Sequence, residues 1–215
     1  MIKNKDKVKE LLLKQVHSSN INYRYFLTLD YPYKQTNYNK VLLDNKYLRK
    51  FLRKFFKCDL KMIMFIEKHT DPSSNHFGGY HRHVLLQEIP AERWLDPTGG
   101  MMTFLLSMDA EAAFGVRMGA VPPTRTQERL LKKVVRDLVL SVPNGFVGSN
   151  VTTIEESKGG VEGLIGYLTK QTDRYHPAYE LIDPTSSDVD IQPILGIYNG
   201  ANKITRYERI SSAIS

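Results

Sequence analysis

The chain has 215 residues, one cysteine and a formal net charge of +7, a length sufficient for one domain with a substantial core. Its composition excludes a disulfide framework or a multi-cysteine zinc site, and no apolar run approaches the roughly 18 residues of a membrane span or the pattern of a signal peptide. We therefore expect a cytoplasmic protein, and the positive charge favours a polyanionic partner.

The first part of the chain predicts a helix, a strand and a second helix. Residues 3–16 form a lysine-rich N-terminal helix, and residues 22–31 are an aromatic and apolar strand that stops at Pro32. Residues 40–57 carry apolar side chains at helical spacing with basic residues on the other faces, which predicts an amphipathic helix.

A β-hairpin follows, with strands at residues 61–68 and 81–87 and a loop at 70–79 that is rich in Asp, Pro, Ser, Asn and Gly. Residues 90–123 contain a Met- and Ala-rich piece that predicts either a helix or a partly mobile insertion. Most of these methionines are expected to fill the core.

The remaining segments complete one domain with a core at about 22–172. We predict a helix at 124–142, a strand at 151–155 and a helix at 161–172, then an extended or loosely packed C-terminal extension at 174–215. Hairpins with segregated helices indicate an α+β fold with a mostly antiparallel sheet.

Two histidines form the first candidate site. His81 and His83 are two apart on a predicted strand, so both side chains leave the same face. If the hairpin turns near its middle, Glu67 lies across from them, with His69 on the same face. Two imidazoles and a carboxylate bind several divalent ions, including zinc, although an isolated H-x-H pair is more often a pair of surface histidines. The other histidines are expected to be structural or exposed: His17, His76 and His176.

The second candidate site is on the last predicted helix, where Tyr167 lies at the edge of an apolar stripe and Lys170 lies one turn on. A phenol with a pKa near 10 attacks a phosphodiester only if the phosphate is polarised and the phenolate is stabilised. A divalent ion and a neighbouring ammonium supply these two effects. The same spacing also occurs by chance in many helices, as a half-buried tyrosine and a solvated lysine.

In combination, these segments resemble the HUH endonuclease superfamily, specifically its rolling-circle replication initiator (Rep) proteins. FLTLDYP at 26–32 resembles the first family motif. Glu67-Lys68-His69, a glycine, and HRHVLLQ at 81–87 resemble the second motif with its upstream acidic ligand, and YLTK at 167–170 resembles the third. The three motifs occur in family order.

The resemblance implies an RRM-like (ferredoxin-like) fold and a nickase that initiates replication of a plasmid or virus. Glu67, His81 and His83 would hold Mg²⁺ or Mn²⁺. Tyr167 would cut single-stranded DNA at a replication origin, leaving a 5′-phosphotyrosine and a free 3′-hydroxyl, and the reverse reaction would rejoin the strand. Lys170 would assist at the phosphate or position the metal site.

The sequence departs from the family pattern at Arg82, where a hydrophobic residue is usual. On a strand this side chain points away from the histidines, so it must reach solvent, a carboxylate or DNA. The sequence holds no G-x-x-x-x-G-K-[ST] motif, so a separate helicase is expected, and Tyr175 does not repeat the tyrosine motif. The basic residues considered for DNA binding are Arg82, Arg49, Arg53, Arg125 and Arg129.

Three alternatives stay open. A transposase or relaxase would use the same chemistry, and its distinction from a Rep protein rests on family analogy. A non-catalytic RRM-like protein would stack bases on Tyr23, Tyr25 and Phe26, although a core role is favoured for them. A zinc hydrolase would use the same three ligands, but no general base is evident. The sequence indicates no oligomeric state.

Overall fold

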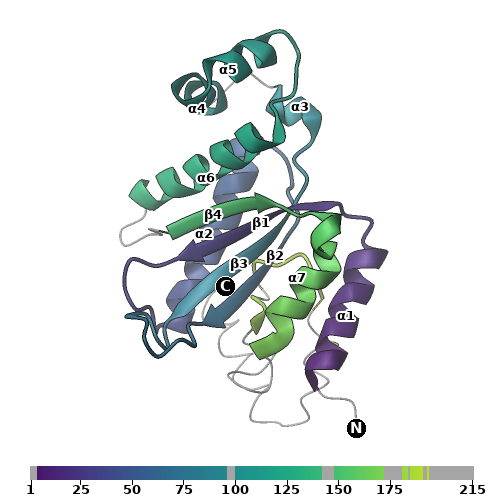
Figure 1. Ribbon diagram of the computed structural model, residues 1–215, viewed down its shortest axis with the longest axis vertical. Helices are drawn as coiled ribbons and strands as arrows, with labels where there is room; N and C mark the ends of the chain where they lie inside the picture. Colours follow the sequence, from purple (N-terminus) through teal and green to yellow (C-terminus); the bar gives the residue numbers. More distant parts are fainter. Residues whose placement is uncertain are drawn as a thin grey trace.

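The chain folds around a four-stranded antiparallel sheet with the strand order β2-β3-β1-β4. Figure 1 shows the computed structural model, which describes residues 4–95, 100–141, 148–171, 181–183, 185–190 and 193. The strands are β1 (Tyr23–Asp30), β2 (Met62–Lys68), β3 (Tyr80–Gln87) and β4 (Gly148–Thr153). The predicted α+β class and antiparallel sheet are confirmed.

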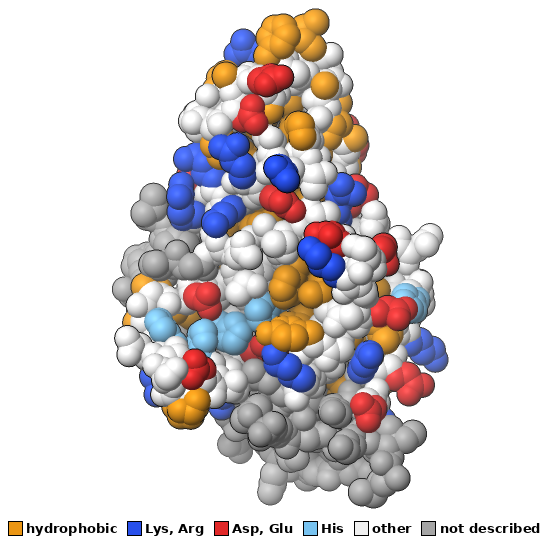
Figure 2. Space-filling model, in the orientation of Figure 1, with side chains coloured by type: hydrophobic (Ala, Val, Ile, Leu, Met, Phe, Trp, Pro, Cys, Tyr) orange, Lys and Arg blue, Asp and Glu red, His pale blue; other side chains and the backbone are white. Residues whose placement is uncertain are grey.

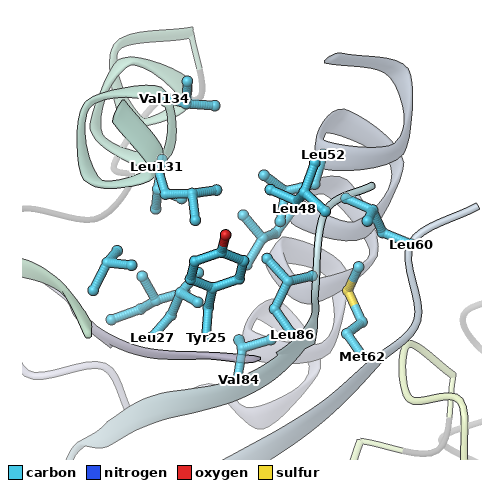
Figure 3. Close-up of a cluster of buried hydrophobic side chains, with 14 of the residues drawn as sticks. Tyr25, Leu27, Leu48, Leu52, Leu60, Met62, Val84, Leu86, Leu131 and Val134 are labelled. Atoms are coloured by element: carbon cyan, nitrogen blue, oxygen red, sulfur yellow. The ribbon is translucent and has the colours of Figure 1, made fainter. Parts of the chain in front are cut away.

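One face of the sheet is covered by α2 (Tyr38–Phe56) and α6 (Thr124–Ser141), the two longest predicted helices. Apolar residues from β1, β2 and β3 meet apolar residues of both helices in a single core (Figure 3). In β1, alternate residues such as Leu27 and Leu29 enter this core, because successive side chains of a strand point to opposite faces.

The opposite face of the sheet is covered by α1 (Asn4–Ser18) and α7 (Gly160–Leu168), which lie in front of it in Figure 1. Their apolar residues form a second, smaller core with the sheet, including Leu12, Ile165 and Phe65. Because β2 and β3 are covered on both faces, most of their residues are buried. A 3₁₀ turn, Glu156–Lys158, precedes α7, and another, Thr169–Gln171, ends the predicted helix at 161–172.

The segment predicted as a helix or a mobile insertion contains three short helices: α3 (Ala91–Trp94), α4 (Gly100–Met108) and α5 (Ala110–Arg117). Helices α4 and α5 extend beyond the sheet, at the top of Figure 1. The Asp109 side chain caps α5 by accepting a hydrogen bond from the Ala112 amide. Among the described helices, none has an apolar stretch of the length that crossing a membrane requires.

Of the C-terminal segment that was predicted to be extended or loosely packed, residues 181–183 and 185–190 pack against the sheet. Leu181 and Ile182 are buried, the Asp183 amide donates to the Met64 carbonyl, and the Asp188 amide donates to the Met62 carbonyl. The segment therefore covers the free edge of β2, where the backbone groups of an edge strand would otherwise be unpaired. Three apolar residues, Leu181, Ile182 and Val189, are too few to predict such pairing from periodicity.

Candidate metal and nucleophile site

The predicted metal ligands come together on the face of the sheet that α7 covers. The β2–β3 register places Glu67 directly opposite His81, as the hairpin prediction required. Glu67 Oε2 lies 3.4 Å from His81 Nε2 and 3.3 Å from His83 Nε2, and the two imidazole nitrogens are 3.1 Å apart. Ligands at ordinary bond lengths to one divalent ion lie about 3–3.5 Å from each other, so the three atoms fit a common ion.

The electrostatics of this cluster also suit a cation. Glu67 is only 1% exposed; burial alone raises the pKa of its carboxyl, but hydrogen bonds from His81 and His83 outweigh burial and lower the pKa to about 2. Burial lowers the pKa of His83, which favours the neutral imidazole that binds metals. Glu67 Oε1 is buried and has no hydrogen-bond partner in the described residues, as expected of a carboxylate whose coordination is completed by an ion.

Strand β1 orients His83. The β1–β3 register places Thr28 opposite His83, and Thr28 Oγ1 lies 3.1 Å from His83 Nδ1, so the nitrogen that faces away from Glu67 is held by a hydroxyl. Phe26, two residues earlier on the same face, stacks on the His83 ring with centroids 5.1 Å apart. Both residues belong to the FLTLDYP motif, but the sequence alone did not assign these roles to them.

The predicted nucleophile lies next to this cluster. The Tyr167 and His83 ring centroids are 6.4 Å apart and the rings meet edge to face. Tyr167 is half-exposed, while its helix neighbours Ile165 and Leu168 are buried and fix α7 on the sheet. The fold therefore brings Tyr167 beside one of the predicted metal ligands, although the two residues are far apart in the sequence.

Lys170 lies over the ring of Tyr167, with Nζ 3.3 Å from the ring centroid. The chain leaves the α-helical path at Thr169 and continues as a 3₁₀ turn, in which residues three apart lie in line along the axis. Tyr167 is in the last turn of α7 and Lys170 is in the 3₁₀ turn that follows, and the ammonium over the ring forms a cation–π contact.

The prediction that Arg82 binds DNA is wrong, because this side chain is fully buried on the other face of β3. Its Nη1 donates to Asn45 Oδ1 at 3.1 Å, and the guanidinium lies 4.6 Å from the centroid of the Tyr31 ring. Asn45 in turn donates to Asp183 Oδ2 at 2.9 Å. The arginine thus donates to an amide that in turn binds the Asp183 carboxylate, whereas the sequence predicted that it reaches solvent, a carboxylate or DNA directly.

The other arginines divide into two groups. Arg49 and Arg53 both bind Asp188, at 2.6 and 3.2 Å, so they hold the C-terminal segment to α2, a role that the prediction of DNA binding missed. Arg125 and Arg129 are exposed on α6 and stay candidates. Together with other exposed basic residues they form one helical stripe, hereafter the α6 stripe: Arg125, Arg129, Lys132 and Arg136.

Two histidines join the site beyond the predicted ligand set. The His69 ring lies 4.3 Å from that of His81 and 5.5 Å from that of His76, and Figure 2 shows histidine side chains gathered in one band on this face. His69 was predicted to lie on the same face as the metal ligands, whereas His76 was expected to be structural or exposed. Because His76 is in the hairpin loop, no strand or helix pattern predicted its position. Tyr175 and His176 lie outside the described residues.

In comparisons with family models, curated proteins and solved structures, nothing matches this chain.

Proposed function

We propose that the chain is a metal-dependent nickase of single-stranded DNA, of the HUH replication-initiator type. The observation that carries the proposal is the position of Tyr167 beside His83, one of the imidazoles of the Glu67 cluster. A phenol and a candidate divalent-ion site occur side by side although they come from a helix and a hairpin that are far apart in the sequence. Neither group alone would indicate phosphodiester chemistry.

The residues divide the reaction between them. Glu67, His81 and His83 would hold Mg²⁺ or Mn²⁺, which supplies Lewis-acid polarisation of a phosphate oxygen when bound. The Tyr167 phenol oxygen attacks phosphorus and loses its proton, while the bond from phosphorus to the 3′ oxygen breaks and that oxygen gains a proton. The products are a 5′-phosphotyrosine and a 3′-hydroxyl, and reversal of the step rejoins the strand. Lys170, over the tyrosine ring, keeps a positive charge near the incoming phosphate.

The fold is compatible with an enzyme of this type, and the aromatic residues favour it over a non-catalytic RRM-like protein, which would share the fold. Apart from α1 and the short helices α3, α4 and α5, the elements from β1 to β4 follow the order β-α-β-β-α-β, which together with the strand order β2-β3-β1-β4 is compatible with an RRM-like (ferredoxin-like) sheet. A stacking platform for bases needs exposed aromatic side chains, but Tyr23 and Tyr25 are buried, and Phe26 stacks on His83. The position of Tyr167 favours tyrosine-based strand transfer over a zinc hydrolase. Initiation at a plasmid or viral origin, with a separate helicase, is part of the proposal, and a transposase or relaxase would show the same chemistry.

The test uses two pools of single-stranded oligonucleotides of random sequence, labelled at the 5′ or at the 3′ end. With Mn²⁺, wild-type protein is expected to retain the 3′ label through denaturing electrophoresis, because a 5′-phosphotyrosine joins it to the downstream fragment. The 5′ label is expected on a shortened, protein-free fragment. Tyr167→Phe is expected to yield neither product.

Tyr47→Phe is the matched control, since Tyr47 is 49% exposed against 50% for Tyr167 but lies on α2. This variant is expected to retain full activity. Retention of the 3′ label by Tyr167→Phe would remove this tyrosine from the mechanism. Retention of the 5′ label by the wild type would contradict the polarity of the proposed intermediate.

A further inference from the structure

A second group of ligand atoms lies beside the first. Asp30, His69 and His81 each offer one atom, and these atoms lie within 4.8 Å of one another. His69 Nε2 is 3.6 Å from Asp30 Oδ1, close to the separation of two ligands on one ion. All three side chains are partly exposed, so an ion from solution has access to them.

The backbone holds this second group in place. The His69 amide donates to the Gly79 carbonyl at 2.9 Å, and the Gly78 amide donates to the His69 carbonyl at 2.8 Å, which extends the hairpin beyond the ends of β2 and β3. Gly78 has a φ of +75°, a conformation that glycine adopts without strain. Asp30 ends β1 on the same face as Thr28. The group is therefore formed by ordered elements.

The donor set differs from that of the first group in one respect. The His76 ring lies 5.5 Å from the His69 ring, so a third imidazole is available next to Asp30, His69 and His81. With His76 the group offers three imidazoles and one carboxylate, one imidazole more than the first group, and an additional imidazole favours zinc and similar transition metals over magnesium, which prefers oxygen ligands and retains its waters. The chemistry of this group therefore points to a borderline transition-metal ion.

We propose that Asp30, His69 and His81 form a second metal site, which takes Zn²⁺ or a similar ion and shares His81 with the first site. His81 connects the two groups, because it contributes a ligand atom to each. Occupation of the second site changes the ligand that the first site depends on. If the protein is a nickase as proposed above, zinc at this site reduces the Mn²⁺-dependent reaction.

The binding test removes the first site and then asks whether zinc stays. Full-length His83→Gln is titrated with Zn²⁺ by calorimetry and is expected to bind one equivalent. In that background, His69→Gln and, separately, Asp30→Asn are each expected to weaken zinc binding at least tenfold. His17→Gln is the matched control, since His17 is an exposed histidine on α1 paired with Glu162, and it is expected to leave zinc binding unchanged.

Circular dichroism of each variant checks that it is folded, and two independent substitutions keep the test decisive if one variant is unstable. Zinc affinity that is unchanged by both His69→Gln and Asp30→Asn overturns the second site. Because calorimetry needs no DNA cleavage, this result would leave the nickase proposal intact. Conversely, absence of the tyrosine adduct would leave a zinc site measured in this way unaffected.

Discussion

The two faces of strand β3 carry buried polar side chains that have different neighbours. On one face, Arg82 supplies the positive charge itself and binds Asn45 and Tyr31. On the other face, His81 and His83 converge on Glu67, and one carboxylate oxygen and one imidazole nitrogen have no partner in the described residues. Alternating residues of one strand thus place a buried cation among neutral groups behind the sheet and a cluster of possible metal ligands in front of it, which teaches that burial of polar groups alone does not identify a site.

The largest expected effect on stability comes from replacing Arg82. Arg82→Met should lower the free energy of unfolding by about 3–5 kcal/mol, because removal of one partner leaves other buried polar groups uncompensated. His83→Gln, on the opposite face, should cost only about 1 kcal/mol in metal-free buffer. Urea denaturation of both variants and the wild type measures the difference. Equal losses in the two variants would show that the two faces contribute alike to stability.

The second effect comes from binding of an ion to the cluster of Glu67, His81 and His83. Mn²⁺ at about a hundred times its dissociation constant should stabilise the wild type by about 2.7 kcal/mol, since the ion binds only the folded state. Thermal unfolding with Mn²⁺ or with a chelator measures this shift. Glu67→Gln should lose most of the shift, whereas a full shift in that variant would place the ion elsewhere.

A smaller loss is expected at Asn45, which links Arg82 to Asp183. Asn45→Ala should cost about 1–3 kcal/mol, the range for leaving a buried hydrogen-bonding group unsatisfied. Asn39→Ala, at an exposed position of the same helix, is the control and should change the unfolding free energy by less than about 0.5 kcal/mol. A comparable loss in both variants would indicate an effect on α2 itself.

The smallest effect on stability is expected at the α6 stripe. The double variant Arg125→Ala/Arg129→Ala should change the unfolding free energy by less than about 1 kcal/mol, because both side chains are exposed. If both contact phosphates, the slope of log affinity for single-stranded DNA against log salt should become shallower by about 1.4. Figure 2 shows Lys and Arg side chains over α6 on the face that carries the histidine band. Lys54→Ala, exposed on α2, should leave the slope unchanged, and an unchanged slope in the double variant would exclude the stripe from the DNA path.

Local patterns predicted much of the fold and part of the site. Periodicity predicted α2, α6 and the hairpin, because a helix and a strand repeat their apolar residues at different intervals. Strand alternation predicted that His81 and His83 share a face and that Arg82 leaves the opposite one. The position of Glu67 followed from the assumption that the hairpin turns near the middle of its loop, and the β2–β3 register agrees with that assumption.

Long-range contacts were outside the reach of such patterns. No local pattern indicated that Asp188 binds Arg49 and Arg53, that residues 181–183 and 185–190 cover the edge of β2, or that His76 approaches His69. Each of these contacts depends on how the chain folds between the two residues, and the periodicity of a single helix or strand carries no information about that. The basic residues of α2 had therefore suggested DNA binding by Arg49 and Arg53, but in the structure both arginines bind Asp188 of the C-terminal segment.

The amino-acid sequence by itself determined which residue types are available and which of them share a face of one strand or helix, because local backbone geometry fixes those relations. Only the tertiary structure decided that Tyr167 lies beside His83 and that Arg82 is enclosed by the protein. The physical reason is that these positions depend on how α7 and α2 pack against opposite faces of the sheet. That packing is set by apolar cores built from the whole chain.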